Sequence, residues 1–129
     1  MDHALAAKGT SVDKLRVFVS KYVEINTQRA EVPVLFQSAE ELEPDAAQRA
    51  RYRRSQIDHK LAKLIESGVE AGELKSPAPL ISAYGMLGAI NWMHTWYRPE
   101  GRYAANEVAE MLTDLLLYGL ANKRTARGD

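Results

Sequence analysis

The 129-residue sequence contains no cysteine. Disulfides, thiolate catalysis and cysteine-based metal sites are therefore excluded, and a reducing, cytoplasmic location is compatible with the composition. The chain also lacks an excess of charge of either sign, since 17 basic residues balance 17 acidic ones. A neutral surface argues against nucleic-acid binding by this segment, because neutralising phosphates requires a basic face.

Patterns for catalysis and metal binding are lacking as well. The three histidines, His3, His59 and His94, are far apart and form no spacing that places two metal ligands on one helix face. Asp58 is adjacent to His59, so the two point in different directions on a helix, and we predict surface charge for both. No Gly-rich phosphate loop or nucleophile elbow occurs, so we expect no catalytic residue, no metal and no cofactor.

Targeting and strand signals are missing too. The opening MDHALAAKGT has no basic segment followed by an apolar core, which excludes a signal peptide at this point. No segment shows the sustained period-two alternation of a β-strand. The longest apolar block, residues 76–98, is too interrupted by polar residues for a good membrane span. The sequence therefore predicts an all-α domain without a membrane partner.

Helical periodicity predicts a bundle of about five to six helices. Besides a central helix, four of them cover about residues 10–25, 33–42, 44–71 and 105–121. Thr10 and Asp13 resemble a capping box at the first of these, and Asn26 opens a polar turn after it. Gly72 is a candidate C-terminal stop for the long helix, and Asn106 a candidate cap for the last one.

The apolar block at residues 76–98 predicts the central helix, with Ser76 as its N-cap and Pro77 in the first helical position. Its faces are apolar nearly all round, which is typical of a helix buried on all sides. A domain of this size has little room for such a helix. We therefore expect one face to pack on the domain's own core and another on a second copy of the chain.

Two groups of polar residues have more than one interpretation. Asn91, His94 and Arg98 follow i, i+3, i+7 spacing and are predicted to share a face. They are either anchors for a polar part of a ligand, or hydrogen-bonding groups across a dimer with Arg98 stabilising the helix C-terminus. Four arginines of the long helix form either a solvated face or a mouth that attracts an anionic ligand: Arg49, Arg51, Arg53 and Arg54.

The sequence LGAINWMHTWYRPEG at residues 87–101, followed by NEVAEMLTDLLLYGL at 106–120, resembles the C-terminal half of the ligand-binding domain of TetR-family transcriptional regulators. The family shows a small-residue helix that ends in tryptophan, a WYRP-G-type turn, and an acidic-apolar helix that ends in GL. The order of the upstream elements agrees with it. The resemblance implies that residues 1–9 end a helix from a missing DNA-binding half, that 10–121 form an effector-binding and dimerisation domain, and that 122–129 are a disordered tail.

The resemblance further implies a cytoplasmic repressor that forms a homodimer through a four-helix bundle and contacts operator DNA only through the absent N-terminal domain. The last two helices of each subunit would build that bundle. The expected interface residues are Tyr84, Gly85, Gly88, Ala89, Met111, Leu112, Leu115, Leu116 and Gly119.

The resemblance also implies a pocket for a small apolar effector, for which an acyl-CoA or fatty-acid-like compound is the first hypothesis. The predicted lining residues are Phe18, Tyr22, Phe36, Ile57, Leu61, Asn91, Trp92, His94 and Trp96. Large rings with polar tips suit an apolar pocket that contains a few orienting groups. The alternative is that these residues are ordinary core, and that the chain is a helical dimerisation module without a ligand.

Overall fold

The computed structural model describes residues 9–28 and 44–122. These residues form the helices α2 (Ser11–Gln28), α4 (Pro44–Glu70), α5 (Pro79–Asn91) and α6 (Ala105–Tyr118), with a 3-10 helix η2 (Trp92–Thr95) directly after α5. No strand occurs in these two ranges, so the all-α prediction is confirmed for them. The helix end predicted at residues 1–9, apart from Gly9, and the helix predicted at 33–42 lie outside the described residues.

The start of α2 has the capping box that the sequence predicts. The Thr10 hydroxyl accepts a hydrogen bond from the Asp13 N–H, and the Asp13 carboxylate accepts one from the Thr10 N–H, both at 3.1 Å. Gly9 precedes them with φ +119°. The polar turn expected from Asn26 is wrong, because α2 continues to Gln28 and Asn26 is buried.

The long helix α4 begins at Pro44 as expected and ends at Glu70. Gly72 follows with φ +76°, a conformation that favours glycine. The N–H groups of Glu73 and Leu74 both donate to the Gly68 carbonyl and complete the stop. The buried stripe agrees with the predicted periodicity and consists of Ala47, Leu61, Leu64, Ile65 and Gly68.

Both ends of the predicted central helix are wrong. The helix starts at Pro79 with Ala78 in the cap position, so Ser76 is not the N-cap. The Ser76 hydroxyl instead lies 2.7 Å from the Ser82 hydroxyl. The helix ends at Asn91, well before Arg98, and Arg98 therefore does not stabilise its last turn.

Side chains compete with the backbone where α5 ends. In a continuing helix the carbonyl of Trp92 would accept from the Trp96 N–H. Here the Thr95 hydroxyl donates to that carbonyl at 2.7 Å, and the Trp96 N–H donates to Met93. The Asn91 carbonyl accepts a hydrogen bond of 3.0 Å from the His94 ring nitrogen Nδ1. Local side-chain bonds of this kind favour the tighter 3-10 turn.

The last helix, α6, starts at the predicted residue but is capped differently. Ala104 stands in the cap position, and the Glu107 carboxylate accepts its N–H at 2.9 Å. Asn106 is inside the helix, so its prediction as the cap is wrong. The helix ends at Tyr118 rather than at residue 121, because Gly119 adopts φ +77°.

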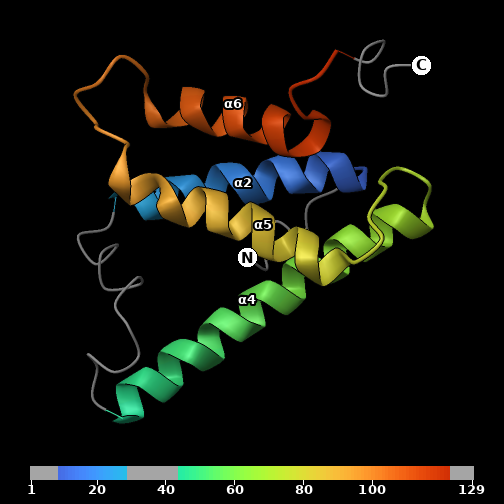
Figure 1. The fold of residues 1–129 in the computed structure, drawn as a ribbon, viewed down its shortest axis with the longest axis horizontal. Coiled ribbons are helices and arrows are strands. Elements are labelled where there is room, and N and C mark those ends of the chain that lie inside the picture. The colour runs from blue at the N-terminus through green and yellow to red at the C-terminus, as the bar shows by residue number, and fades with distance from the viewer. Residues whose placement is uncertain (1–8, 29–43, 123–129) are drawn as a thin grey trace.

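The helices α4, α5 and α6 are arranged around α2 (Figure 1). On one side α6 lies along α2, and on the other α5 crosses it and packs against α4, which extends diagonally beyond the others. An ion pair of 2.9 Å between Arg16 and Asp114 connects α2 with α6. The shared core contains Leu15, Phe18, Val19, Val23, Leu61, Leu64, Ile65, Ala83, Met86, Leu87, Ile90, Met93, Val108 and Ala109. Among the described residues, no helix has the length and apolar content needed to cross a membrane.

Candidate functional site

Aromatic and aliphatic side chains fill the interior between α2, α4 and α5. Phe18 of α2 is 2% exposed, and Tyr22 stacks on it with ring centroids 5.6 Å apart and planes 11° from parallel. Leu61 of α4 is fully buried in the same core, and Ile57 packs against that core from one turn earlier. Residues one turn apart share a helix face. The inner faces of α2 and α4 therefore meet here.

Polar side chains from two helices gather at the Tyr22 hydroxyl. The Asn26 amide nitrogen Nδ2 donates to the Tyr22 backbone carbonyl at 2.8 Å. The side chains of Asn26 and, from the end of α5, Asn91 also act on the Tyr22 hydroxyl and lower its pKa. Within the described part of the chain, the Oδ1 atoms of both amides are buried and have no hydrogen-bond partner. Because buried polar atoms are nearly always paired, these two acceptors indicate a candidate binding site.

Charged side chains of α4 act on the same hydroxyl. Asp58 and Arg54 both influence Tyr22 electrostatically. Burial raises the pKa of the Tyr22 hydroxyl, while the side chains of Asn91 and Asn26 lower it. Burial also raises the pKa of the Asp58 carboxyl, against the opposite influence of neighbouring positive charge. Tyr22, Asn26, Asn91 and Asp58 are called the Tyr22 cluster below.

The structure brings together some of the predicted ligand-binding residues and separates others. Those in or next to the Tyr22 cluster are Phe18, Tyr22, Ile57, Leu61 and Asn91. Trp92 and Trp96 are 61% and 48% exposed and lie outside this interior. His94 is exposed and stands edge-on to Trp92, with ring centroids 5.7 Å apart. Phe36 lies outside the described residues.

Two members of the cluster were not predicted as site residues. Asp58, for which we predicted surface charge, is half-buried. It lies one position after Ile57 and three before Leu61, which places it at the edge of the α4 apolar stripe. Asn26 follows Tyr22 by four residues on the face of α2 that also carries Phe18. Extending the α2 periodicity by one turn would have included Asn26.

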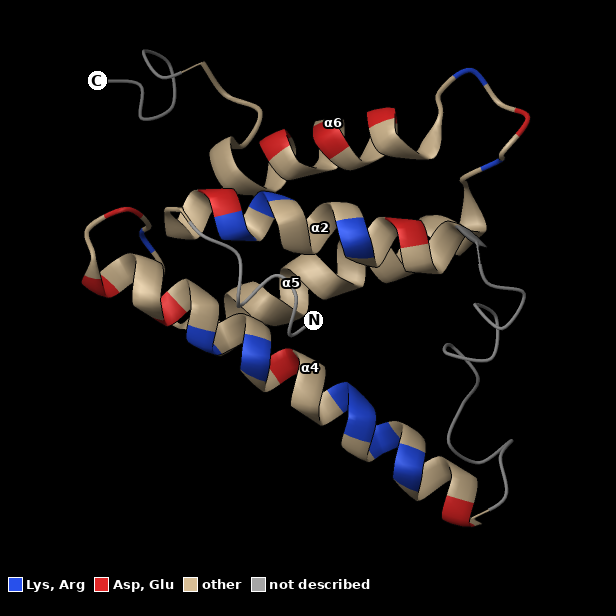
Figure 2. Ribbon diagram, turned by 180° about the vertical axis from the view of Figure 1, so that it is seen from behind, with Lys and Arg blue, Asp and Glu red and all other residues tan. Residues whose placement is uncertain are grey.

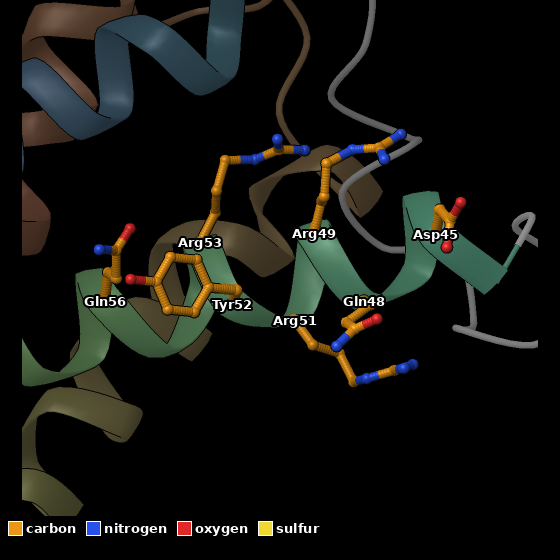
Figure 3. Close-up of a pocket in the computed structure, with 7 residues that line it drawn as sticks. All are labelled: Asp45, Gln48, Arg49, Arg51, Tyr52, Arg53 and Gln56. Atoms are coloured by element: carbon orange, nitrogen blue, oxygen red, sulfur yellow. The ribbon is translucent and has the colours of Figure 1, made fainter.

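A second feature is a hollow of about 700 Å³ along the first half of α4. Its lining residues in the described part of the chain are Asp45, Gln48, Arg49, Arg51, Tyr52, Arg53 and Gln56. Figure 3 shows Arg49 and Arg53, one turn apart, extending to the same side of the helix, while Arg51 extends to another. Basic residues colour this half of α4 in Figure 2. The arginines thus form an exposed cationic surface, and the choice between a solvated face and an anion-attracting mouth stays open.

A third feature is an exposed apolar stripe along α5. Ile81, Tyr84 and Trp92 are 65%, 48% and 61% exposed. Gly85 and Gly88 lie between them, and a Cβ added at either glycine would meet no atom within 4 Å. These five residues are called the α5 stripe. Trp92 therefore shares a surface with the predicted interface glycines rather than with the Tyr22 cluster.

The last helix carries a matching exposed stripe of Met111, Leu115 and Tyr118, called the α6 stripe. Of the other predicted interface residues, Gly119 is exposed, whereas Ala89, Leu112 and Leu116 are half-buried. A groove of about 320 Å³ opens between the two helices, and Gly85 and Met86 of α5 line it together with Leu116 and Leu117 of α6. Exposed apolar residues grouped on neighbouring helices are typical of interaction sites.

The comparisons with known proteins agree with this architecture. The family model described as "Tetracyclin repressor-like, C-terminal domain" matches residues 8–120. The chain belongs to this family, which is the regulatory portion of TetR-type transcriptional regulators. A comparison with curated proteins gives no match.

Several solved structures share the fold. A TetR/AcrR-family regulator from Thermobifida fusca has a TM-score of 0.80 and 27% identity, over 94% of this chain and 68% of that one. The TetR-family regulator PfmR from Thermus thermophilus has a TM-score of 0.82 and 26% identity, over 94% of this chain and 66% of that one. AibR, solved with isovaleryl coenzyme A and operator DNA, has a TM-score of 0.78 over 90% of this chain and 63% of that one. At 18% identity, AibR shows the fold alone. This chain spans about two thirds of the length of these structures.

Proposed function

We propose that this chain is the effector-binding and dimerisation domain of a TetR-like transcriptional repressor. The observation that carries the proposal is the Tyr22 cluster, a group of incompletely paired polar side chains inside an otherwise apolar interior. Tyr22, Asn91 and Asp58 are half-buried, so the cluster reaches the surface of the described structure on one side. An apolar site with a few orienting polar groups is the usual composition of a small-molecule pocket.

Regulation by an effector requires that it binds one conformation more tightly than the other. A compound with equal affinity for both states would leave their populations unchanged. An effector bound between α2, α4 and α5 would change the packing of α4 against α2. The helix α2 begins close to the N-terminus of the chain. We place the link to a DNA-binding segment there, upstream of Ser11. DNA contact is assigned to that segment and not to residues 9–122.

The first effector class to test is an acyl-CoA. AibR, which has the same fold, was solved with isovaleryl coenzyme A, and this supports the class without identifying the compound for this chain. Arg49 and Arg53 on the α4 hollow would face the anionic phosphates of such a ligand, because guanidinium groups pair well with phosphate. The acyl chain would then lie toward the apolar interior, and an amide N–H of the pantetheine arm would lie at the Tyr22 cluster.

Thermal unfolding of the 129-residue chain with isovaleryl-CoA and octanoyl-CoA tests this proposal. A ligand that binds the folded state raises its stability by RT ln(1 + [L]/Kd). Arg49→Glu/Arg53→Glu should abolish the stabilisation by acyl-CoA. Lys63→Glu/Arg102→Glu, at two exposed positions outside the hollow, is the charge-matched control. No stabilisation by any acyl-CoA or fatty alcohol would contradict the effector site and favour a dimerisation module without a ligand.

We further propose a homodimer through the α5 and α6 stripes. Together with the groove beside Gly85, they leave an apolar surface that a second copy of the chain covers by the same two helices. The result would be a four-helix bundle with two-fold symmetry, in which both subunits use the same surface patch. Native mass spectrometry at micromolar concentration tests this assembly, and a stable monomer would contradict it.

A further inference from the structure

The Tyr22 cluster contains two buried acceptor oxygens that pair with no donor of the described residues. Asn26 is 7% exposed, and its Nδ2 is committed to the Tyr22 backbone carbonyl at 2.8 Å. That bond fixes the orientation of the amide, because turning it over would place Oδ1 against a second carbonyl oxygen. The Asn26 Oδ1 atom is therefore an acceptor that is buried and, among the described residues, has no partner. An acceptor of this kind is paired only by an N–H or O–H group from elsewhere.

Asn91 repeats the arrangement from another helix. Its Oδ1 is also buried and without a partner in the described structure. Both amides act on the same Tyr22 hydroxyl, so the side chains of Asn26 and Asn91 lie on the same side of the Tyr22 ring. The two unpaired oxygens thus belong to one site. They come from α2 and α5, between which the whole of α4 intervenes in sequence, and only the tertiary structure places them side by side.

The remaining groups at this point favour the same partner chemistry. The Asp58 carboxyl is another acceptor when ionised, and the rings of Phe18 and Tyr22 form an apolar wall. An ionised carboxylate on a ligand has only acceptor oxygens and cannot pair with the two amide oxygens, and any attraction to it would come from Arg54, which also acts on the Tyr22 hydroxyl. A hydroxyl, an amide N–H or a protonated amine would be received by this arrangement.

We propose that the part of the effector bound at the Tyr22 cluster carries a hydrogen-bond donor, which the Oδ1 atoms of Asn26 and Asn91 accept. This inference rests on the proposed effector site and adds the polarity of the buried end of its ligand. Among apolar compounds it selects hydroxyl- and amide-bearing ones and excludes free fatty acids bound carboxylate-first. A site built to pair with a donor discriminates strongly against an analogue that lacks it, because its own polar groups are then left unpaired.

Titration calorimetry with four probes that share an octyl or octanoyl chain tests the inference on the full 129-residue chain. The probes are 1-octanol, octanamide, octyl methyl ether, which has the oxygen but no donor, and octanoate at about pH 8, where the carboxyl is ionised. We expect the alcohol and the amide to bind at least about tenfold more tightly than the ether and the octanoate. Equal affinity for the alcohol and the ether would overturn this inference and leave the apolar effector site standing. Binding by none of the four would contradict the effector site itself, and the inference with it.

Two variants connect the selectivity with the named oxygens. Asn26→Leu and Asn91→Leu remove the acceptors, and we expect the alcohol-to-ether affinity ratio to fall toward one. Asn26→Leu also removes the Nδ2 bond to the Tyr22 backbone carbonyl, so circular dichroism and urea unfolding check that both variants fold. Asn106→Leu, at an exposed position on α6, is the matched control and should keep the wild-type ratio. An unchanged ratio in both cluster variants would overturn the assignment.

Discussion

The Glu73 carboxylate, in the turn after α4, accepts a hydrogen bond of 3.2 Å from the backbone N–H of Ser11, the first residue of α2. The two residues are 62 positions apart in sequence. The contact joins the C-terminal end of one long helix to the N-terminal end of another. The first N–H groups of a helix have no partner within it, so an acceptor from a distant turn completes the cap that Thr10 and Asp13 begin.

We expect Glu73→Ala to lower the free energy of unfolding by about 1 kcal/mol, which is the typical effect of losing a helix N-cap interaction. Ser11 is buried, so water replaces the lost acceptor poorly. Urea unfolding followed by circular dichroism measures the change. Glu70→Ala, an exposed position three residues earlier, is the control and should change stability by less than about 0.5 kcal/mol. Equal effects of the two variants would show that the Ser11 contact contributes nothing.

Gly68, in the same region, should not tolerate replacement by alanine. Gly68 lies inside α4, where alanine normally stabilises a helix by up to about 1 kcal/mol. A Cβ at this position would fall 2.9 Å from the Ser11 Cβ and against the side chain of Leu74. We therefore expect Gly68→Ala to destabilise the protein by about 1–3 kcal/mol through overpacking.

The neighbouring Ser67→Ala is the control for Gly68→Ala, because Ser67 is exposed and should accept alanine without loss. Chemical unfolding of both variants under the same conditions makes the comparison. A stabilising Gly68→Ala would show that α2 and the turn around Leu74 shift at little energetic cost.

The dimer proposal predicts that a charge on the α5 stripe separates the subunits without unfolding them. Gly88 has open space beside it in the subunit, so Gly88→Arg fits the monomer. In a four-helix bundle the arginine would be buried without a partner, which costs several kcal/mol. We expect the dimer dissociation constant to rise on the order of 100-fold or more. Analytical ultracentrifugation of Gly88→Arg and of Ser67→Arg, at an exposed position of α4, decides the question. A dimer unaffected by the first variant would place the interface elsewhere.

The half-buried carboxyl of Asp58 gives a pH-dependent prediction. Burial raises its pKa in the folded state above the unfolded value of about 3.9. Protonation of Asp58 therefore favours the folded state. This contribution to stability is fully present below the unfolded-state pKa and is lost as the pH rises through the folded-state pKa. At neutral pH the charged carboxylate opposes folding. We expect Asp58→Asn to raise the free energy of unfolding at about pH 7, and this gain to shrink as the pH falls toward about 4.

Urea unfolding between about pH 4 and pH 7 measures the effect of Asp58→Asn. Glu66→Gln, at an exposed position two turns further along α4, is the comparison variant and should show no such gain. A loss of stability in Asp58→Asn at neutral pH would mean that the attraction of neighbouring positive charge outweighs the burial of the carboxylate.

Local signals in the sequence determined most of the helical framework. The Thr10–Asp13 capping box, Pro44 at the start of α4 and Gly72 after its end each depend on residues within one or two turns, and each is observed. The order of the elements also sufficed to identify the family, which the match over residues 8–120 confirms. The C-terminal end of α5 was harder to predict, because the apolar pattern continues beyond it. Side-chain hydrogen bonds from His94 and Thr95 end the α-helix within that pattern.

What the sequence left undetermined is which side of each apolar helix faces inward. Apolar residues lie on nearly every face of α5, so their periodicity does not show which face is buried. The different environments of Asn91 and Trp92, which are adjacent in sequence, could therefore not be predicted. Only the packing of α5 against α4 and α2 placed Asn91 beside Tyr22 and left Trp92 exposed on the α5 stripe. The Tyr22 cluster has the same origin. Its members come from three helices, and their burial, pairing and pKa shifts exist only once those helices pack together.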